Sequence, residues 1–307
     1  MASGVDGGSD RGTSDTGTAP VRLVTMRELG NRGRFGNQLL QRSFIKAWAT
    51  EEGASWGVTP WVGEWLFGLD DLGITAILPK FDERVQDQDV HRPVPPGPGE
   101  LIGYDYAGWC QFPTVWWNPE RRKVWHDYRV TGAWWKRLWP VASKLLTSTV
   151  IGVQIRRGDY GLGSCYDAIT PVQWYLDWLD AHWQELEYPK LFVATEDREL
   201  VEAFAKYNPQ TVESLGIELR AEPYPRYNYL PEDLTSGKAH LLDWFPEWFM
   251  LTQCSVLLAA NSTFSLTAAM ASQKHPQFWR PAWAKKRFVK EDVFNCLPLR
   301  LDCPRKV

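Results

Sequence analysis

Three short segments carry the residue types that bind a diphosphate and stabilise the charge it gains in a reaction. They are a glycine loop at residues 33–38 (GRFGNQ), an arginine pair within residues 155–160 (IRRGDY) and a hydroxyl-rich segment at residues 261–265 (NSTFS). Each lies where a predicted strand gives way to a loop or helix, and open α/β sheets bind ligands at such places. Together, and in this order, they predict one diphosphate site.

The arginine pair carries the most specific chemistry of the three segments. Side chains alternate along a strand, so Gln154 and Arg156 are expected on one face, and Arg157 begins the loop. A guanidinium offers a planar fork of donors that matches phosphate oxygens and keeps its charge. The alternative is a surface ion pair with Asp159, but the position at a strand end and the following Gly158 favour a functional role.

The other two segments are weaker signals when taken alone. The glycine loop lacks the Gly-Lys-Ser/Thr ending of a Walker loop and the spacing of GxGxxG, so it could also be a simple tight turn. Its glycines allow close backbone approach, and helix amides near Asn37 attract an anion. Ser262 and Thr263 can bind phosphate or merely cap a helix. Asn261 begins a glycosylation sequon, which we discount because no secretory signal precedes it.

Strands alternating with helices must position these segments. Apolar periodicity and turn residues predict strands at 21–26, 101–106, 149–157, 190–194, 217–221 and 255–260. The same criteria predict helices at 37–50, 131–146, 170–186, 197–207, 241–254 and 263–272. In the helix from residue 170, Thr170 and Gln173 are expected to form a capping box, with Pro171 in the first turn. The Pro- and Gly-rich residues 90–99 predict irregular structure.

This alternation predicts an α/β protein with parallel sheets covered on both faces. Two such halves, each beginning with a strand and a functional loop, suggest two Rossmann-like domains facing across a cleft. We expect a disordered tail at residues 1–20, an N-terminal acceptor-side domain at 21–147, a donor-binding domain at 148–290 and a C-terminal extension at 291–307.

Composition excludes several classes of function. The chain has 307 residues and a net charge of −3, so no basic field supports nucleic-acid binding. Five cysteines without CxxC spacing and five histidines without ligand spacing argue against structural zinc, other metal sites and a disulfide framework. Without an apolar leader or membrane-length segment, we expect a cytoplasmic protein with no integral membrane segment. Most of the 18 tryptophans are expected in the core, and a few could stack on sugars.

The motif order GRFGNQ, IRRGDY and NSTFS, the last followed by an Ala-rich helix, resembles the GDP-fucose-dependent fucosyltransferases. The pattern is most similar to the α-1,2-fucosyltransferase family, and the GRFGNQ loop also resembles protein O-fucosyltransferases. The resemblance covers roughly residues 21–290 and is strongest over 148–272. It implies a GT-B-like fold, a GDP-fucose donor, a glycan acceptor, inversion at the anomeric carbon and no required metal or other cofactor.

Carried over by position, the resemblance places Arg156 on the β-phosphate as a catalytic residue, with Asp159 beside it. The donor-binding positions it implies are Arg34, Gly36, Asn37, Gln154, Arg157, Glu247, Ser262, Thr263 and Phe264. Glu247 would read guanine, because a carboxylate offers two acceptors to the parallel N1–H and N2–H₂ donors. The family has a histidine at the position of Gln154, and residues 194–197 match its acidic loop only loosely.

The expected reaction is a single displacement, in which an acceptor hydroxyl, such as one on galactose, attacks fucose while GDP departs. Asp159, Glu28 and Glu196 are candidates for the base, and the sequence does not choose among them. Two alternatives remain open: a transferase that uses another nucleotide sugar, and a catalytically silent glycan-binding protein on the same scaffold. The sequence does not specify the acceptor, because acceptor loops vary freely on a fixed scaffold.

Overall fold

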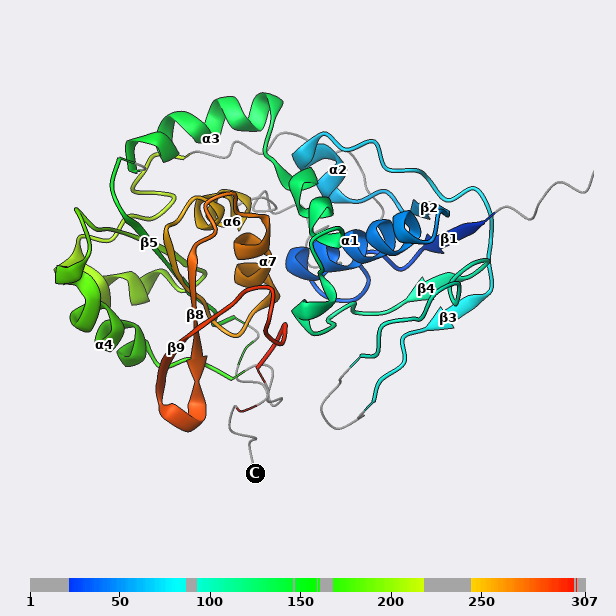
Figure 1. The fold of residues 1–307 in the computed structure, drawn as a ribbon. Coiled ribbons are helices and arrows are strands. Elements are labelled where there is room, and N and C mark those ends of the chain that lie inside the picture. Colours follow the sequence, from blue (N-terminus) through cyan, green and yellow to red (C-terminus); the bar gives the residue numbers. More distant parts are fainter. Residues whose placement is uncertain are drawn as a thin grey trace, which may run out of the picture.

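The computed structural model describes residues 22–86, 93–145, 147–158, 160, 168–217, 244–300 and 302. They form two α/β halves that lie side by side, each with its own parallel or mostly parallel sheet (Figure 1). The predicted tail at 1–20, the catalytic candidate Asp159 and most of the predicted strand 217–221 lie outside the described residues.

The first half contains a four-stranded sheet of order β2-β1-β4-β3, in which all neighbouring strands are parallel. The strands are β1 (Leu23–Met26), β2 (Ser55–Val58), β3 (Lys80–Asp82) and β4 (Asp105–Ala107). Helix α1 (Phe35–Glu51) packs on β1 and β2, and the short helix α2 (Val62–Phe67) follows β2. The path from β1 through the glycine loop into α1 is the predicted βα unit.

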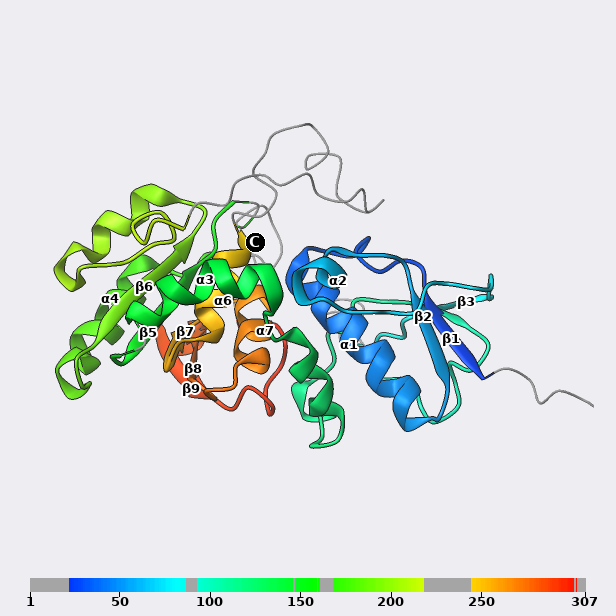
Figure 2. The same ribbon diagram turned by 90° about the horizontal axis from the view of Figure 1, so that it is seen from above.

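The second half contains a five-stranded sheet of order β6-β5-β7-β8-β9. The strands are β5 (Val150–Ile155), β6 (Lys190–Thr195), β7 (Val256–Leu258), β8 (Gln277–Ala282) and β9 (Arg287–Glu291). Only the edge strand β9 runs antiparallel to its neighbour among these strands. The helices are α3 (Gly132–Leu145), α4 (Val172–His182), α6 (Trp244–Thr252) and α7 (Thr263–Ala271). Helix α3 lies over α6 in both views (Figures 1 and 2).

Strand β5 follows the predicted alternation and separates two layers of helices. Ile151, Val153 and Ile155 pack into the apolar cluster that contains α4. On the opposite face, a side chain at Gly152 would meet Cys254 and Leu251, which belong to the α6 side. The odd and even positions of β5 therefore face different layers, as expected for a strand buried on both sides.

The two halves share one apolar core instead of meeting across a wet interface. Phe35 at the start of α1 lies 4.3 Å, between ring centroids, from Trp244 and 5.5 Å from Trp248, both on α6. Phe67 on α2 lies 5.9 Å from Phe245 in the same way. Aromatic pairs at these separations add to the free energy gained by burial alone. The halves are therefore fixed to each other by rings from α1, α2 and α6.

A buried ionic network fastens α1 within the first half. Arg42 is only 1% exposed, and its guanidinium binds Asp71 at 2.6 Å and also pairs with Asp127. Trp61 donates its indole N–H to Asp71 at 3.0 Å. Breaking one partner of such a pair would leave an uncompensated buried charge, which is strongly destabilising.

Several predicted elements differ from the observed ones. The strand predicted at 101–106 is reduced to β4, because residues 101–103 form a turn. The capping box at Thr170 is wrong: α4 begins at Val172 with Pro171 before it, and Gln173 donates to Asp177 instead. The predicted helix 197–207 is a 3₁₀-helix. The described 3₁₀-helices are Thr114–Trp116, Arg121–Tyr128, Trp183–Glu185, Arg198–Tyr207 and Trp283–Lys285.

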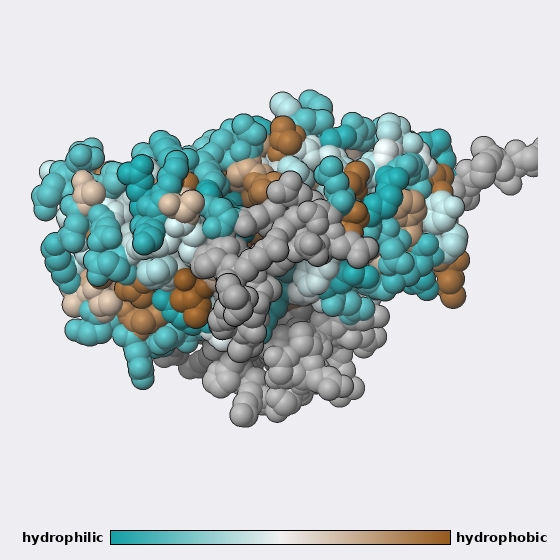
Figure 3. Space-filling view, turned by 90° about the horizontal axis from the view of Figure 1, so that it is seen from below, coloured by the Kyte–Doolittle hydropathy of each residue, from teal (hydrophilic) through white to brown (hydrophobic). Residues whose placement is uncertain are grey.

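The tryptophans are core residues for the most part, as predicted. All 18 lie among the described residues, and Trp135, at 37% exposure, is the only one in the exposed class. It stacks on Trp139 of the same helix with ring centroids 4.4 Å apart. On the face seen in Figure 3, the described surface is mainly hydrophilic, with apolar side chains in small separate patches.

Candidate active site

The first and third motifs meet at the junction of the two halves, where the N-terminal ends of α1 and α7 touch. A Cβ built at Gly36 would lie 2.6 Å from the backbone nitrogen of Phe264 and 2.6 Å from the carbonyl carbon of Thr263. Only glycine allows two helix backbones to approach this closely. Two helix N-terminal ends lie side by side here, and their dipoles make this region attractive to an anion.

The loop before α1 is shaped by a second glycine and an asparagine. Gly33 has φ of +84°, and a Cβ there would lie 1.9 Å from Nδ2 of Asn37. The amide of Asn37 therefore folds back over Gly33, and its Oδ1 accepts from Nε2 of Gln111 at 2.8 Å. Arg34 is the exposed residue immediately before the helix. Both Asn37 and Arg34 thus lie at the N-terminal end of α1.

The third motif caps α7. The hydroxyl of Ser262 accepts from the backbone N–H of Phe264 at 3.2 Å. Of the two roles expected for this residue, the structure therefore shows the helix cap. Thr263 and Phe264 are only partly buried, and they form the first turn of the helix beside Gly36. The cap therefore uses the hydroxyl of Ser262 and the backbone N–H of Phe264.

The arginine pair lies at the C-terminal end of β5 and is held by one carboxylate. Oε1 of Glu196 accepts from Nη1 of Arg156 at 2.9 Å and from the backbone N–H of Arg157 at 2.7 Å. Arg157 donates from Nη1 to the carbonyl of Arg156 and from Nη2 to that of Thr170. Arg157 therefore braces the loop, whereas the side chain of Arg156, 17% exposed, lies beside the ring of Tyr160.

Tyr160 connects the second motif to the third. The guanidinium of Arg156 lies 5.3 Å from the ring centroid of Tyr160, within the range of a cation–π contact. The hydroxyl of Tyr160 donates to the carbonyl of Asn261 at 2.8 Å. The arginine loop and the segment that begins α7 are therefore neighbours at the same edge of the second sheet.

Gln154 is buried next to this edge with one acceptor unpaired. It is 4% exposed, and no described residue donates to its Oε1. A buried acceptor without a partner costs free energy, so a donor from a ligand or water fits this position. Its own carbonyl accepts from the hydroxyl of Tyr175 at 2.9 Å, which fixes the strand at this point.

Glu247 lies on α6 with its carboxylate bound to an arginine from the neighbouring strand end. Nη1 of Arg198 donates to Oε1 of Glu247 at 2.8 Å, and Nη2 lies 2.6 Å from Oε1 of Glu213. Glu247 is 8% exposed, and burial raises its pKa to about 7, against the opposing effect of Arg198. Near neutral pH this carboxyl is therefore divided between its charged and neutral forms.

The described base candidates are both engaged in ion pairs. Glu28, after β1, lies 3.1 Å from Nζ of Lys80 and 3.1 Å from Nε of Arg32. Glu196 binds Arg156 as described above. Neither geometry singles out a base, and Asp159 lies outside the described residues.

Sequence reasoning missed several residues that build this site. Gln111 and Trp109 come from a loop after β4 and contact Asn37 and Gly33, and no local pattern announced them. Arg198 gave no signal because it belongs to a helix start of ordinary composition. Tyr160 lies inside the IRRGDY motif, and only the fold shows its bond to Asn261.

No group of three or more His, Cys, Asp and Glu side chains in the described ranges is arranged to hold a metal ion. In the same part of the chain, no helix is both long enough and apolar enough to span a membrane.

Comparison with solved structures identifies the fold. The α-1,6-fucosyltransferase NodZ, in crystals soaked with GDP-fucose, matches with a TM-score of 0.54 and 12% identity, over 88% of this chain and 99% of that chain. NodZ from Bradyrhizobium matches with a TM-score of 0.51 and 11% identity, over 88% and 98%. FUT1 of Arabidopsis thaliana with GDP gives 0.46 and 13%, over 90% and 71%.

These similarities confirm the predicted fold class, a two-domain α/β fold of the GT-B type. No protein-family model matches the chain, and no curated protein matches it in sequence.

Proposed function

We propose that the protein is an inverting glycosyltransferase that moves fucose from GDP-fucose to a hydroxyl of a glycan acceptor. The observation that carries this proposal is the backbone contact of Gly36 with Thr263 and Phe264. It joins two of the three diphosphate motifs, from opposite halves, and Tyr160 and Asn261 connect the third. The shared fold with NodZ, whose crystals were soaked with GDP-fucose, supports the same function.

In this reaction the acceptor oxygen forms a bond to the anomeric carbon of fucose while the bond from that carbon to the β-phosphate oxygen breaks. The electron pair of the broken bond leaves with GDP, and the acceptor proton passes to a base. Charge therefore grows on the β-phosphate. Arg156, held in place by Glu196, would stabilise this charge more in the transition state than in the bound donor. Arg157 would keep the loop in shape through its two carbonyl contacts.

The guanine base would be read by Glu247. Its buried carboxylate, oriented by Arg198, can accept from two parallel N–H groups, which guanine offers and adenine lacks. Gln154 would supply a neutral hydrogen-bonding group where the resembled family has histidine. We expect GDP to bind more tightly than ADP or UDP for this reason.

We further propose that donor binding needs no metal, because the positive charges of Arg156 and the two helix ends can neutralise a diphosphate. Calorimetry of GDP binding with and without EDTA tests this. Equal affinity in both buffers is expected, and loss of binding on chelation would refute the metal-free reading.

The donor and acceptor are tested together. GDP binding is measured by calorimetry, and GDP release is then followed with GDP-fucose and a panel of glycans that carry terminal galactose or core N-acetylglucosamine. The motif resemblance favours an α-1,2 bond to galactose, whereas NodZ is an α-1,6-fucosyltransferase. Mass spectrometry and NMR of the product separate the two linkages. Release only with another GDP-sugar, or glycan binding without turnover, would support one of the two alternatives instead.

A further inference from the structure

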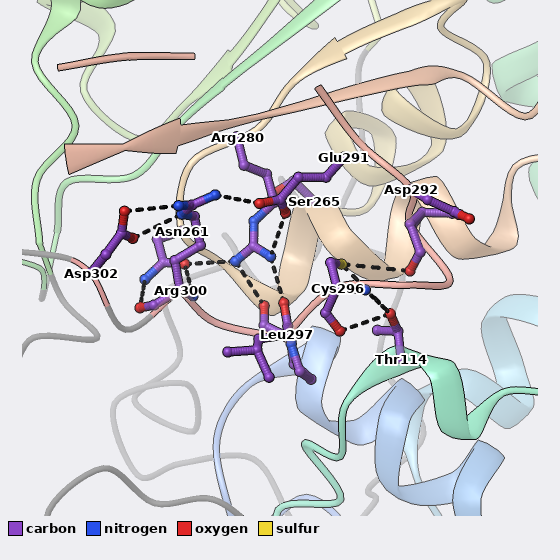
Figure 4. Close-up of polar contacts among 12 residues, drawn as sticks. Thr114, Asn261, Ser265, Arg280, Glu291, Asp292, Cys296, Leu297, Arg300 and Asp302 are labelled. Carbon is purple, nitrogen blue, oxygen red and sulfur yellow. Dashed lines mark hydrogen bonds and ion pairs between the residues drawn. The ribbon is translucent and has the colours of Figure 1, made fainter. Parts of the chain in front are cut away.

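The chain after β9 returns from the second half to the first, and we call residues 292–300 the C-terminal strap (Figures 1 and 4). On the first half the strap is fastened at Thr114. The backbone N–H of Thr114 donates to the carbonyl of Cys296 at 2.8 Å, and its hydroxyl accepts from the N–H of Cys296 at 2.8 Å. The guanidinium of Arg122 lies 4.0 Å from the ring centroid of Phe294.

On the second half the strap is fastened by a buried arginine. Arg280 on β8 is 1% exposed and donates to the carbonyls of Leu297 at 2.5 Å and Pro298 at 3.1 Å. Nη2 of Arg280 also donates to Oδ1 of Asn261 at 2.8 Å. A buried guanidinium needs most of its donors satisfied, and Arg280 is held by the strap, by Asn261 and by the carboxylate of Glu291 on β9, 3.4 Å from Nη1 (Figure 4).

Asn261 binds the backbone of Arg300 in the strap by two hydrogen bonds. Its Oδ1 accepts from the backbone N–H of Arg300 at 2.7 Å, and its Nδ2 donates to the carbonyl of Arg300 at 3.2 Å. Asn261 is 0% exposed, so the glycosylation sequon it begins is not accessible in the folded protein. The side chain of the first residue of the NSTFS motif is therefore used entirely inside the molecule.

The backbone of Asn261 contacts or adjoins two of the donor motifs. Its carbonyl accepts from Tyr160, whose ring lies beside Arg156, and the next residue, Ser262, caps α7. One residue thus connects the strap, the arginine loop and the helix start. The middle of the strap, at Cys296, is bound to Thr114, which belongs to the other half.

We propose that Arg280 and Asn261 are positioning residues for donor binding, and that the C-terminal strap couples Thr114 in the first half to the geometry of the α7 start. The proposal rests on the proposed function for its ligand, GDP. It makes the closeness of the two halves and the shape of the turn that begins α7 interdependent.

The first test uses Thr114→Val, which keeps the shape of the side chain but leaves the N–H of Cys296 without its hydroxyl acceptor. Thr252→Val is the matched control, because Thr252 is also buried and its hydroxyl donates to a carbonyl of its own helix, that of Phe249. We expect Thr114→Val to raise the donor KM and weaken GDP binding by about three- to tenfold, with the acceptor KM unchanged. Thr252→Val should lower only the melting temperature.

Hydrogen exchange provides a readout that does not depend on turnover. Thr114→Val should speed exchange of the amides at residues 261–266, on the opposite half, and Thr252→Val should not.

The second test compares two buried arginines. Arg280→Lys is the test variant, because lysine keeps the charge but cannot reach three acceptors. Arg42→Lys is the control, because Arg42 is bound to neither the strap nor a motif. At equal loss of melting temperature, only Arg280→Lys should weaken GDP binding, on the order of tenfold or more.

The outcomes separate the two proposals. If Thr114→Val and Arg280→Lys change exchange at residues 261–266 and GDP affinity no more than their controls do, the coupling is refuted while GDP binding by the parent protein still supports the function. If the parent protein binds no GDP, the proposed function fails and the role of Arg280 and Asn261 in donor binding fails with it. The exchange comparison then decides the mechanical coupling by itself.

Discussion

Replacing Gly36 by alanine tests whether the two helix ends form one site. The new Cβ would lie 2.6 Å from the backbone of Thr263 and Phe264, whereas ordinary contact begins at 3.4 Å, so the helices must separate by about 0.8 Å. Both opposing atoms are helix backbone, which cannot rotate away as a side chain can. The substitution therefore forces the halves apart at the proposed phosphate position.

The expected change in the free energy of unfolding has the opposite sign to that of an ordinary Gly→Ala substitution in a helix. Alanine in place of glycine within a helix normally stabilises by roughly 0.5–1 kcal/mol. Overpacking a close contact costs about 1–3 kcal/mol, and the rigid backbone here favours the upper part of that range. The net loss should be about 1–2 kcal/mol, which lowers the melting temperature by roughly 2–6 °C. GDP affinity should fall by more than this loss of stability alone would explain.

Calorimetry of unfolding and of GDP binding on the same samples provides the measurement. Gly73→Ala is the control, because a Cβ at Gly73 meets nothing within 4 Å and its φ is not positive. It should leave both quantities unchanged or raise the melting temperature slightly. A Gly36→Ala protein that melts at or above the parent temperature and binds GDP equally well would show that α1 and α7 do not form a shared site.

Four further predictions concern single side chains. Arg156→Lys keeps the charge but loses the planar fork of donors, so kcat should fall by a factor on the order of 10²–10³ with only a modest loss of GDP affinity. Near-normal turnover in a steady-state assay would show that Arg156 is only an ion-pair partner of Glu196. Because burial raises the pKa of Glu247 to about 7, GDP affinity should increase as pH rises through that value, and Glu247→Gln should bind weakly at every pH; a parallel titration in both proteins would contradict the guanine assignment. The same raised pKa means that this carboxyl favours the folded state below about pH 4.5 and that its contribution is lost as pH rises through 7, which thermal melts should show. Gln154→His should keep or tighten GDP binding if Oε1 faces the nucleotide, and a severe loss in a folded variant would assign the position another role.

The sequence predicted the parts of the fold that local patterns control. Leu40, Phe44, Ala47 and Trp48 recur at helical spacing, and all four are buried in α1. Strand β6 and helix α7 were also found, because long apolar or Ala-rich segments have one favourable arrangement. The short strands β2 and β3 and the edge pair β8 and β9 were not predicted, since their pairing depends on neighbours distant in sequence.

The candidate site also has a part that local sequence patterns predict and a part that they do not. The motifs themselves could be recognised, because glycine, arginine and hydroxyl residues at strand ends have a local chemical meaning. The function of Gly36 in helix contact could not, since its partner, Phe264, is more than 200 residues away in the chain. The capping box at Thr170 failed because the helix begins at Val172, with Pro171 in the capping position at ψ of 134°, so Thr170 lies one residue outside the cap.

The shared aromatic core has a consequence for how the protein is made. Phe67 leaves the ribosome early, but its ring partner Phe245 is synthesised about 180 residues later, which at 5–20 residues per second is a delay of roughly ten to thirty-five seconds. During that interval the first half carries Phe35 and Phe67 without the rings of α6 that cover them in the finished fold. Nascent chains stalled before residue 244 should therefore bind hydrophobic dyes and chaperones, and chains extended past α7 should release them.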